Sequence, residues 1–285
     1  MKPVQDPTRI VQLDGQVLDV HHPVLLANLP GVLRGEGIFE TFLVHDGVPT
    51  PFLERHDARL AHSAQLTGFA ISVGRLCASF EGFLPLVCAG KWRVRLTVLR
   101  GLEERQHFLW TAGAEPPPRL EAVIQIADFR LDPSNPIAGA KTISRMELQV
   151  ARARAQAAGA FEAVLCTIDG DLAEGTSSNI FLWSDGALHT PALSRGILGG
   201  VTRESVIKAC LVANIPVFER KIELHELDTA VEVYISNAVI GLVPVVKIVE
   251  RRKQLPGADG IYLAKLREAY RNYLELMSVT PPVES

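Results

Sequence analysis

The stretch from Lys141 to Asn179 constrains the fold of this chain more than any other. It begins with Lys141-Thr-Ile-Ser-Arg-Met, continues through an alanine-rich run that predicts a helix over 143–158, and reaches an apolar strand at 161–168. The turn Asp169-Gly170-Asp171 then leads into Glu174-Gly-Thr-Ser-Ser-Asn179. Because a hairpin folds its second strand back alongside the first, we expect Glu174 to lie close to groups that are distant from it in sequence.

Composition limits the classes of protein to which the chain can belong. Its 285 residues, 47% hydrophobic and 21% charged, suffice for one large or two medium domains with hydrophobic cores. The formal net charge of -3 provides no electrostatic basis for binding nucleic acid or an anionic membrane. No apolar run approaches the roughly 18 residues of a membrane-spanning helix, and the first residues lack the apolar segment of a signal peptide. The four cysteines have no metal-ligand spacing, so we expect reduced thiols, no metal site and a cytoplasmic protein.

Proline, glycine and polar residues predict a boundary between two domains. Asp132-Pro-Ser-Asn-Pro-Ile-Ala-Gly139 has the composition of a linker. We therefore expect an N-terminal α/β domain over 1–131, a linker over 132–140 and a C-terminal domain over 141–285. The elements expected in the first domain are a glycine-hinged strand over 35–44, a hairpin turn at Asp46-Gly47, a return strand beginning at Phe52-Leu53, a helix over 54–66 ended by Gly68, a strand over 92–99, a turn-rich segment over 101–120 and a strand over 122–126.

Two ionisable residues of the 141–179 stretch could carry chemistry. Lysine is scarce, with 8 residues among the 29 basic ones, and Lys141 follows the small residues Ala138-Gly-Ala. A lysine nucleophile must be deprotonated often enough to attack a carbonyl, which partial burial favours. Glu174 stands between Leu172-Ala173 and Gly175, and a carboxylate buried there must be paired or protonated. The alternatives are a solvent-exposed lysine and a solvated glutamate in a turn.

Other polar segments are candidates for binding an anion. Gly196-Ile-Leu-Gly-Gly-Val-Thr-Arg203 feeds a predicted helix, whose first N–H groups can hold a phosphate, although the segment is not a Walker A loop. A plain capped helix is the alternative. Arg59 follows His56 by three residues on one side of a predicted helix and suits bidentate phosphate contact, or else a surface ion pair. Ser236-Asn-Ala238 ends a predicted strand and is a further candidate, with a simple turn as the alternative.

Six motifs occur in an order that resembles the class IV (fold-type IV) pyridoxal phosphate enzymes, which include branched-chain aminotransferases, D-amino-acid transaminases and 4-amino-4-deoxychorismate lyases. The resemblance covers about residues 30 to 250. It implies an α+β fold with a smaller N-terminal α/β domain, a larger C-terminal domain with a β-barrel-like core, and a homodimer. The motifs are Gly35-Glu-Gly-Ile-Phe-Glu-Thr, Glu54-Arg-His-Asp-Ala-Arg-Leu60, Lys141-Thr-Ile-Ser-Arg-Met, Glu174-Gly-Thr-Ser-Ser-Asn-Ile-Phe181, Gly200-Val-Thr-Arg203 and Ser236-Asn-Ala-Val-Ile-Gly-Leu-Val-Pro-Val245.

The resemblance also implies a role for individual residues. Lys141 matches the Schiff-base lysine that moves the proton, and Glu174 matches the partner of the pyridine nitrogen, which keeps the ring an electron sink. Arg59 matches the phosphate-binding arginine. The remaining matched cofactor contacts are the backbone amides of Val201 and Thr202, the loop residues Ser177, Ser178 and Asn179, and the phosphate-side residues Asn237 and Ala238.

The choice among family members depends on a few positions. Phe39-Glu-Thr41 and the segment after Ser236 look most like the aminodeoxychorismate lyases, which release pyruvate and 4-aminobenzoate in folate biosynthesis. Branched-chain aminotransferases usually carry Phe-Glu-Gly and a tyrosine where Met146 stands here. The lyases in turn often have asparagine at the position of Ser144.

Binding of the substrate carboxylate is less clearly marked in the sequence. Arg105-Gln-His107 looks like the Arg-x-His carboxylate trap of D-amino-acid transaminases, and Arg95 is a further candidate. We expect a lyase first, a D-amino-acid or other transaminase second and a branched-chain enzyme third. A non-catalytic, ligand-binding relative is the remote alternative.

Overall fold

The computed structural model describes residues 8–21, 25 and 27–279 and divides into two compact units. The first unit comprises Met1–Pro117 with Ala140–Ser144, and the second comprises Pro118–Gly139 with Arg145–Ser285. The expected domain boundaries therefore lie elsewhere than at 131 and 141. Strand β7 (Ala122–Leu131) pairs with strands of the second unit, while the segment that carries Lys141 joins the sheet of the first.

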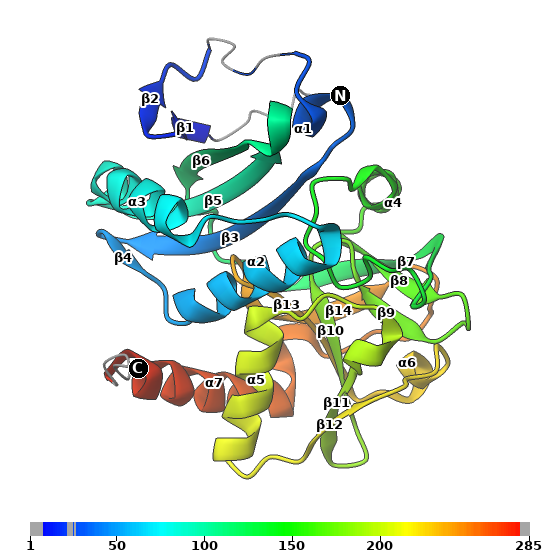
Figure 1. Ribbon diagram of the computed structural model, residues 1–285. Helices are drawn as coiled ribbons and strands as arrows, with labels where there is room; N and C mark the ends of the chain where they lie inside the picture. Colours follow the sequence, from blue (N-terminus) through cyan, green and yellow to red (C-terminus); the bar gives the residue numbers. More distant parts are fainter. Residues whose placement is uncertain (1–7, 22–24, 26, 280–285) are drawn as a thin grey trace. The chain divides into compact units, whose positions relative to one another are not determined.

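The first unit is an antiparallel sheet covered on one face by helices (Figure 1). Within its described part, six strands are ordered β2-β1-β6-β5-β3-β4. Phe42, Trp110 and Phe83 are buried between the sheet and the helices, with Leu60 of helix α2 beside them. The elements are β1 (Thr8–Leu13), β2 (Gln16–Leu18), α1 (Pro30–Leu33), β3 (Gly37–His45), β4 (Val48–Pro49), α2 (Leu53–Thr67), α3 (Val73–Phe83), β5 (Lys91–Arg100) and β6 (Gln106–Ala114), with 3-10 turns at Leu84–Val87 and Leu102–Glu104.

Several predictions for the first unit are confirmed and two are wrong. Helix α2 ends at a left-handed Gly68, as expected. Phe52-Leu53 does not begin a return strand, because Phe52 is the N-cap of α2 and the return strand is only Val48–Pro49. The segment 101–120 is not merely turn-rich, since β6 pairs with both β1 and β5. Its buried residues Phe108, Trp110 and Ala112 alternate with more exposed ones, which is the period of a strand with one face in the core.

The second unit contains a large curled sheet. Its described strands, eight in number, are ordered β12-β11-β10-β13-β14-β7-β8-β9. The sheet folds back on itself, because Leu172 N of β9 donates to Ile222 O just after β12, and Asp171 forms a bridge with Glu223. The predicted β-barrel-like core and the α+β fold are thus confirmed. The elements are β7 (Ala122–Leu131), α4 (Met146–Ala157), β8 (Glu162–Thr167), β9 (Leu172–Gly175), β10 (Asn179–Ser184), β11 (Ala187–Pro191), α5 (Val201–Val212), β12 (Val217–Arg220), α6 (Glu226–Thr229), β13 (Glu232–Asn237), β14 (Gly241–Ile248) and α7 (Ile261–Val279), with 3-10 turns at Leu193–Arg195 and Gly257–Asp259.

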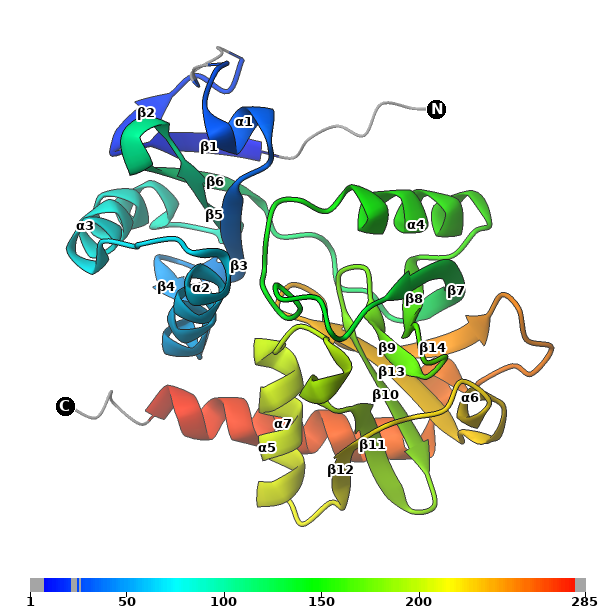
Figure 2. The ribbon, with the colours of Figure 1, turned by 45° about the vertical axis from the view of Figure 1, so that its right-hand side comes forward.

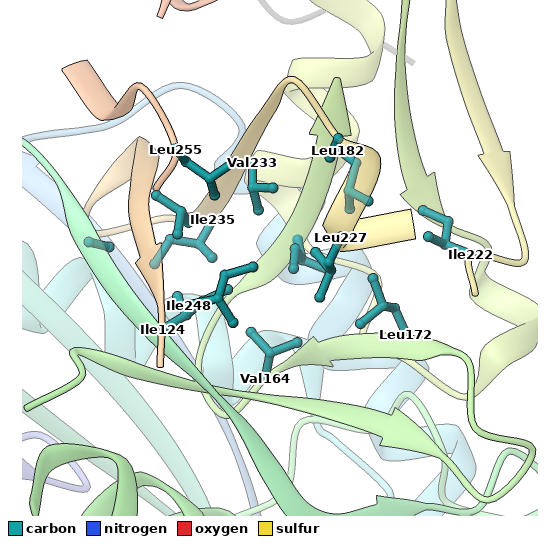
Figure 3. Packing of buried hydrophobic residues seen from close by; sticks show 14 of the residues in the cluster. Ile124, Val164, Leu172, Leu182, Ile222, Leu227, Val233, Ile235, Ile248 and Leu255 are labelled. Atoms are coloured by element: carbon teal, nitrogen blue, oxygen red, sulfur yellow. The ribbon is translucent and has the colours of Figure 1, made fainter. Parts of the chain in front are cut away.

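Aliphatic side chains fill the inside of this curled sheet (Figure 3). Ile124, Val164 and Ile235 come from three different strands and are fully buried. Outside the sheet, α5 packs across α7 (Figure 2). Among the residues whose structure is described, no helix combines the length and apolar character that crossing a bilayer requires.

Candidate active site

The backbone around Lys141 is hydrogen-bonded to strand β3, on the side of β3 away from β5. Phe39 N donates to Lys141 O at 2.9 Å, Ile143 N donates to Gly37 O at 2.9 Å, and Lys141 N donates to Ser63 Oγ at 3.0 Å. This antiparallel pairing places Lys141 opposite Phe39, and its half-buried amine lies 4.5 Å from the centroid of the Phe39 ring. A side chain at Gly37 would prevent this arrangement, since its Cβ would lie 2.8 Å from Ile143 Cδ1. Lys141 is thus half-buried on a fixed backbone, and the alternative of a solvent-exposed lysine does not hold.

Arg95 shares the Phe39 ring with Lys141. Its guanidinium carbon lies 3.7 Å from the ring centroid, and its Nε donates to Thr97 Oγ1 at 3.1 Å. Strand pairing explains the neighbourhood, because Arg95 is opposite Thr41 and points to the same face of the sheet as Phe39. The structure thus brings together Arg95 and Lys141, which are 46 positions apart in the sequence.

The other two predicted substrate residues lie farther along the strands. His107 is opposite Leu99, four positions from Arg95, and its Nδ1 is 2.7 Å from Asp14 Oδ2. The side chain of Arg105 is exposed, and its carbonyl accepts a bond from Gly101 N. Within the first unit, neither residue is grouped with Lys141.

Arg59, the predicted phosphate-binding arginine, is held by a buried carboxylate that the sequence analysis did not identify, Glu40. Glu40 lies on the helix-facing side of β3, and Arg59 Nε and Nη2 donate to its two oxygens at 2.8 and 2.6 Å. His56 Nδ1 is 2.7 Å from Glu40 Oε2. The predicted neighbours His56 and Arg59 do share one side of α2, with 3.3 Å between Nη2 and Nδ1. The signal in the sequence was a glutamate at an inward position of an otherwise apolar strand.

The protonation states of this cluster follow from burial and charge. Burial alone would raise the pKa of Glu40, but the charge and hydrogen bonds of Arg59, together with His56, lower it to about 2. Burial lowers the pKa of His56, and the positive charges of Arg59 and Lys141 lower it further against the opposing effect of Glu40. At neutral pH the cluster is therefore an ionised glutamate between an arginine and a neutral histidine, which donates from Nδ1.

In the second unit, Glu174 is linked to the loop before helix α5. Leu198 N donates to Glu174 Oε2 at 3.1 Å, and Asn179 Nδ2 donates to Leu198 O at 3.2 Å. Glu174 is half-buried at the end of β9 and lies near Arg145. Burial lowers the pKa of Arg145, while the charge of Glu174 raises it. Glu174 and Asn179 are thus both hydrogen-bonded to the backbone of Leu198, a residue of the glycine-rich loop.

The loop residues predicted to contact a cofactor are themselves hydrogen-bonded. Ser177 Oγ and Ser178 Oγ both donate to the buried carboxylate of Glu162. Asn237 Nδ2 donates to Ser177 O at 3.0 Å, and Asn237 Oδ1 accepts bonds from the amides that follow Ala238. Glu162 at the start of β8 therefore holds Ser177 and Ser178 just after Glu174, and the pairing of β10 with β13 brings Asn237 beside them.

The first turn of helix α5 is built to leave backbone donors available. Its N-cap is Gly200, which provides no side-chain cap, and Val201 and Thr202 are buried. N–H groups at a helix N-terminus attract an anion through both their hydrogens and the helix dipole. This geometry agrees with the predicted anion-binding role of the segment better than with a helix capped by a side chain.

A side chain at Gly200 is expected to displace Asn179. An alanine Cβ at this position would lie 1.8 Å from Asn179 Oδ1, whereas nothing lies within 4 Å of a Cβ at Gly199. We predict that Gly200→Ala destabilises the protein by about 1–3 kcal/mol through overpacking and displaces Asn179 from Leu198. Gly199→Ala is the matched control, and urea unfolding of both proteins is the measurement. Equal stabilities for the two variants would contradict the close packing of Asn179 on Gly200.

Comparisons with known proteins identify the family and the fold of the chain. The sequence pattern of the family described as "Amino-transferase class IV" matches residues 37–248. A Methanocaldococcus jannaschii protein that carries the name of a branched-chain-amino-acid aminotransferase is 29% identical, over 92% of this chain and 95% of that protein. A D-alanine aminotransferase from Bacillus licheniformis is 27% identical, over 85% of this chain and 89% of that protein. The crystal structure of 4-amino-4-deoxychorismate lyase from Pseudomonas aeruginosa is 25% identical, covers 92% of this chain and 98% of that one, and superposes with a TM-score of 0.79.

Fold and site define a fold-type IV enzyme with two units, one carrying the lysine and one carrying the glutamate. The chain belongs to the class IV aminotransferases, a family of enzymes that depend on pyridoxal phosphate. The residues present fit that cofactor. Taken unit by unit, the chain offers groups of the chemistry that this cofactor needs: a half-buried lysine in the first unit, and a carboxylate at Glu174 and a helix N-terminus without a side-chain cap in the second.

Proposed function

We propose that this class IV enzyme is a 4-amino-4-deoxychorismate lyase that releases pyruvate and 4-aminobenzoate. The amine of Lys141 and the guanidinium of Arg95 lie over the ring of Phe39, 4.5 and 3.7 Å from its centroid, so an amine and a group able to bind a carboxylate are neighbours. This observation supports a substrate that presents an amine to one residue and a carboxylate to the other. The strand Phe39-Glu-Thr41, with Thr41 opposite Arg95, supports the lyase within the family.

Each residue has a part in this reaction. Bound pyridoxal phosphate would supply an electron sink for the carbanion of the substrate. Lys141 would hold the cofactor covalently and carry the proton between positions of the substrate, while pyruvate departs and the product becomes aromatic. Glu174 would keep the ring nitrogen protonated. Arg59 and the amides of Val201 and Thr202 would bind the phosphate, with Ser177, Ser178, Asn179, Asn237 and Ala238 around the cofactor.

An amino-acid transaminase is the second candidate. The branched-chain and D-alanine aminotransferases among the similar proteins support it. The sequence motif Arg105-Gln-His107 favours the D-amino-acid reaction, although the structure does not group these two side chains with Lys141. It would use the same first steps, but Lys141 would return the proton to the cofactor carbon and a keto acid would leave. From the family resemblance we also infer that the protein is a cytoplasmic homodimer. Light scattering on the purified protein would test the dimeric state.

One set of assays separates the candidates. Purified protein is incubated with aminodeoxychorismate, and separately with D- and L-amino acids plus 2-oxoglutarate. We expect formation of 4-aminobenzoate with the first substrate. Turnover of amino acids without any 4-aminobenzoate would reject the lyase in favour of the transaminase. Bound cofactor with no turnover of any substrate would indicate a ligand-binding relative.

A further inference from the structure

Glu162 is a buried carboxylate that gathers the loop after Glu174. Its side chain is 0% exposed, and Arg152 Nη1 lies 3.8 Å from Oε2. Three consecutive loop residues donate to it: Thr176 Oγ1 to Oε1, Ser177 N and Oγ to Oε2 at 3.2 and 2.7 Å, and Ser178 Oγ to Oε2 at 3.1 Å. Ala163 N donates to Oε1 at 3.0 Å as well. One carboxylate thus determines the path of residues 176–178.

This loop connects most of the candidate cofactor residues of the second unit. Glu174 precedes it and Asn179 follows it, and both bond to Leu198. The carbonyl of Ser177 accepts a hydrogen bond from the side-chain amide of Asn237. Gly175 leaves room for the packing, since a Cβ there would lie 2.3 Å from Ser178 Oγ and 3.1 Å from Glu162 Cγ. A displacement of residues 176–178 would therefore move Glu174, Asn179 and Asn237 together.

The direction of these bonds has a chemical consequence. A serine hydroxyl has one hydrogen, and the hydrogens of Ser177 and Ser178 both point to Glu162. Ser177 Oγ also accepts a bond from Arg152 Nη1 at 2.6 Å. Neither hydroxyl then has a hydrogen left for a phosphate or a ring oxygen. A buried charge is costly unless several donors surround it, and here the loop provides them.

We propose that Glu162 is a positioning residue of the cofactor site and that Ser177 and Ser178 act through it, not as donors to the cofactor. The inference rests on the proposed function, since it concerns the same pyridoxal phosphate site. In Glu162→Gln, an NH₂ group would replace one carboxylate oxygen. Where it replaces Oε2, the backbone amide of Ser177 loses its acceptor. Glu174 and Asn179 would then be held less tightly.

Glu232 provides a matched control for this substitution. It is also a buried glutamate of the second unit. Its carboxylate accepts hydrogen bonds from the hydroxyl of Tyr234 and, at 2.9 Å, from the backbone amide of Tyr262, so it contacts the start of helix α7 instead of the loop over 176–178. Glu162→Gln and Glu232→Gln are compared by thermal unfolding and by titration of the cofactor-free protein with pyridoxal phosphate, followed by absorbance. We expect both variants to lose stability, and Glu162→Gln alone to bind the cofactor about 10- to 100-fold more weakly.

A double-mutant cycle tests the serines. Ser177→Ala with Ser178→Ala is made in the native chain and in Glu162→Gln. If the serines act through Glu162, their removal weakens cofactor binding in the native chain and adds little in the variant. Equal losses in both backgrounds, or unchanged affinity in Glu162→Gln, would overturn the inference. If Glu162→Gln does not fold, the same cycle is run with Glu162→Asp, which keeps the charge but shortens its reach to the serine hydroxyls: a serine effect that shrinks in this variant supports the inference, and an undiminished one overturns it. Failure of the unsubstituted protein to bind pyridoxal phosphate would instead reject the proposed function.

Discussion

Replacement of Lys141 by alanine is expected to abolish covalent binding of pyridoxal phosphate and to lower turnover by about 10²–10⁴-fold or more, since a single amine is the nucleophile and the proton carrier. The fold should remain, because the backbone of Lys141 is held by Phe39 N and Ser63 Oγ, in bonds in which the lysine side chain takes no part. The visible absorbance of the purified variant and its thermal unfolding are the measurements.

Borohydride reduction followed by peptide mapping identifies the lysine directly. We expect the label on Lys141 in the native chain and no specific label in Lys141→Ala. Lys208→Ala is a suitable control, because Lys208 is an exposed lysine of α5 paired with Glu204 at 2.6 Å. A label on a different lysine would remove the basis for the proposed function.

Substitution of Glu40 should have the largest effect on stability. In Glu40→Gln the charge between Arg59 and His56 disappears, while Arg59, whose side chain is only 10% exposed, stays charged. Removing one partner of a buried ion pair typically lowers the free energy of unfolding by about 3–5 kcal/mol, because the other charge is left uncompensated. Cofactor affinity should fall as well, since Glu40 fixes the orientation of the proposed phosphate arginine.

Urea unfolding at pH 7.5 checks this prediction. The control is Asp128→Asn, which breaks the exposed pair of Asp128 and Arg154 and should change stability by less than about 1 kcal/mol. Similar effects of the two substitutions would show that Glu40 contributes no more than a surface charge.

The same cluster should make the protein sensitive to acid. The pKa of Glu40 is lowered to about 2 from 4.5, and that of His56 is lowered from 6.5. Both groups bind fewer protons in the folded than in the unfolded chain, so their contributions are complete above pH 6.5. Stability should decrease first below pH 6.5 as unfolded His56 gains its proton, and again between pH 4.5 and 2. In Glu40→Gln the second decrease should be smaller when unfolding is measured across this range, and the part that remains comes from other carboxylates of lowered pKa such as Asp171 and Glu226.

Much of the fold could be predicted from local patterns. The helix of 146–157, the strand of 162–167 and the hairpin to Glu174 lie where the periodicity and the Asp-Gly turn indicated, because each depends on neighbours in the chain. Strand β6 was missed since the turn signals of residues 101–105 and 115–118 obscured a short alternation around Trp110. The domain boundary was misplaced because strand pairing joins β7 to β8 and β14, and sequence spacing carries no record of such pairing.

In the candidate site, too, local motifs could be predicted from the sequence and contacts between distant segments could not. The order of six motifs sufficed to indicate the family, which the match over residues 37–248 confirms. The sequence marked Glu40 and Glu162 only as acidic residues beside apolar ones. Their partners were not visible, because such a residue has the same local sequence whether it lies in solvent or among buried donors. The sequence leaves Arg93, Arg95, Arg100 and Arg105 as candidates for the substrate carboxylate, and the register of β3 on β5 distinguishes Arg95 as the neighbour of Lys141.

By itself, the sequence determined which residues are chemically able to act: a scarce lysine after small residues, a glutamate behind a tight turn and glycines ahead of a helix. Only the tertiary structure decided which partners hold them, namely Ser63 and β3 for Lys141, Leu198 for Glu174, and Glu40 for Arg59. The physical reason is that residue type and local spacing set propensity and reactivity over a few positions. Burial, charge pairing and hydrogen-bond direction depend instead on strands and helices that meet from distant parts of the chain.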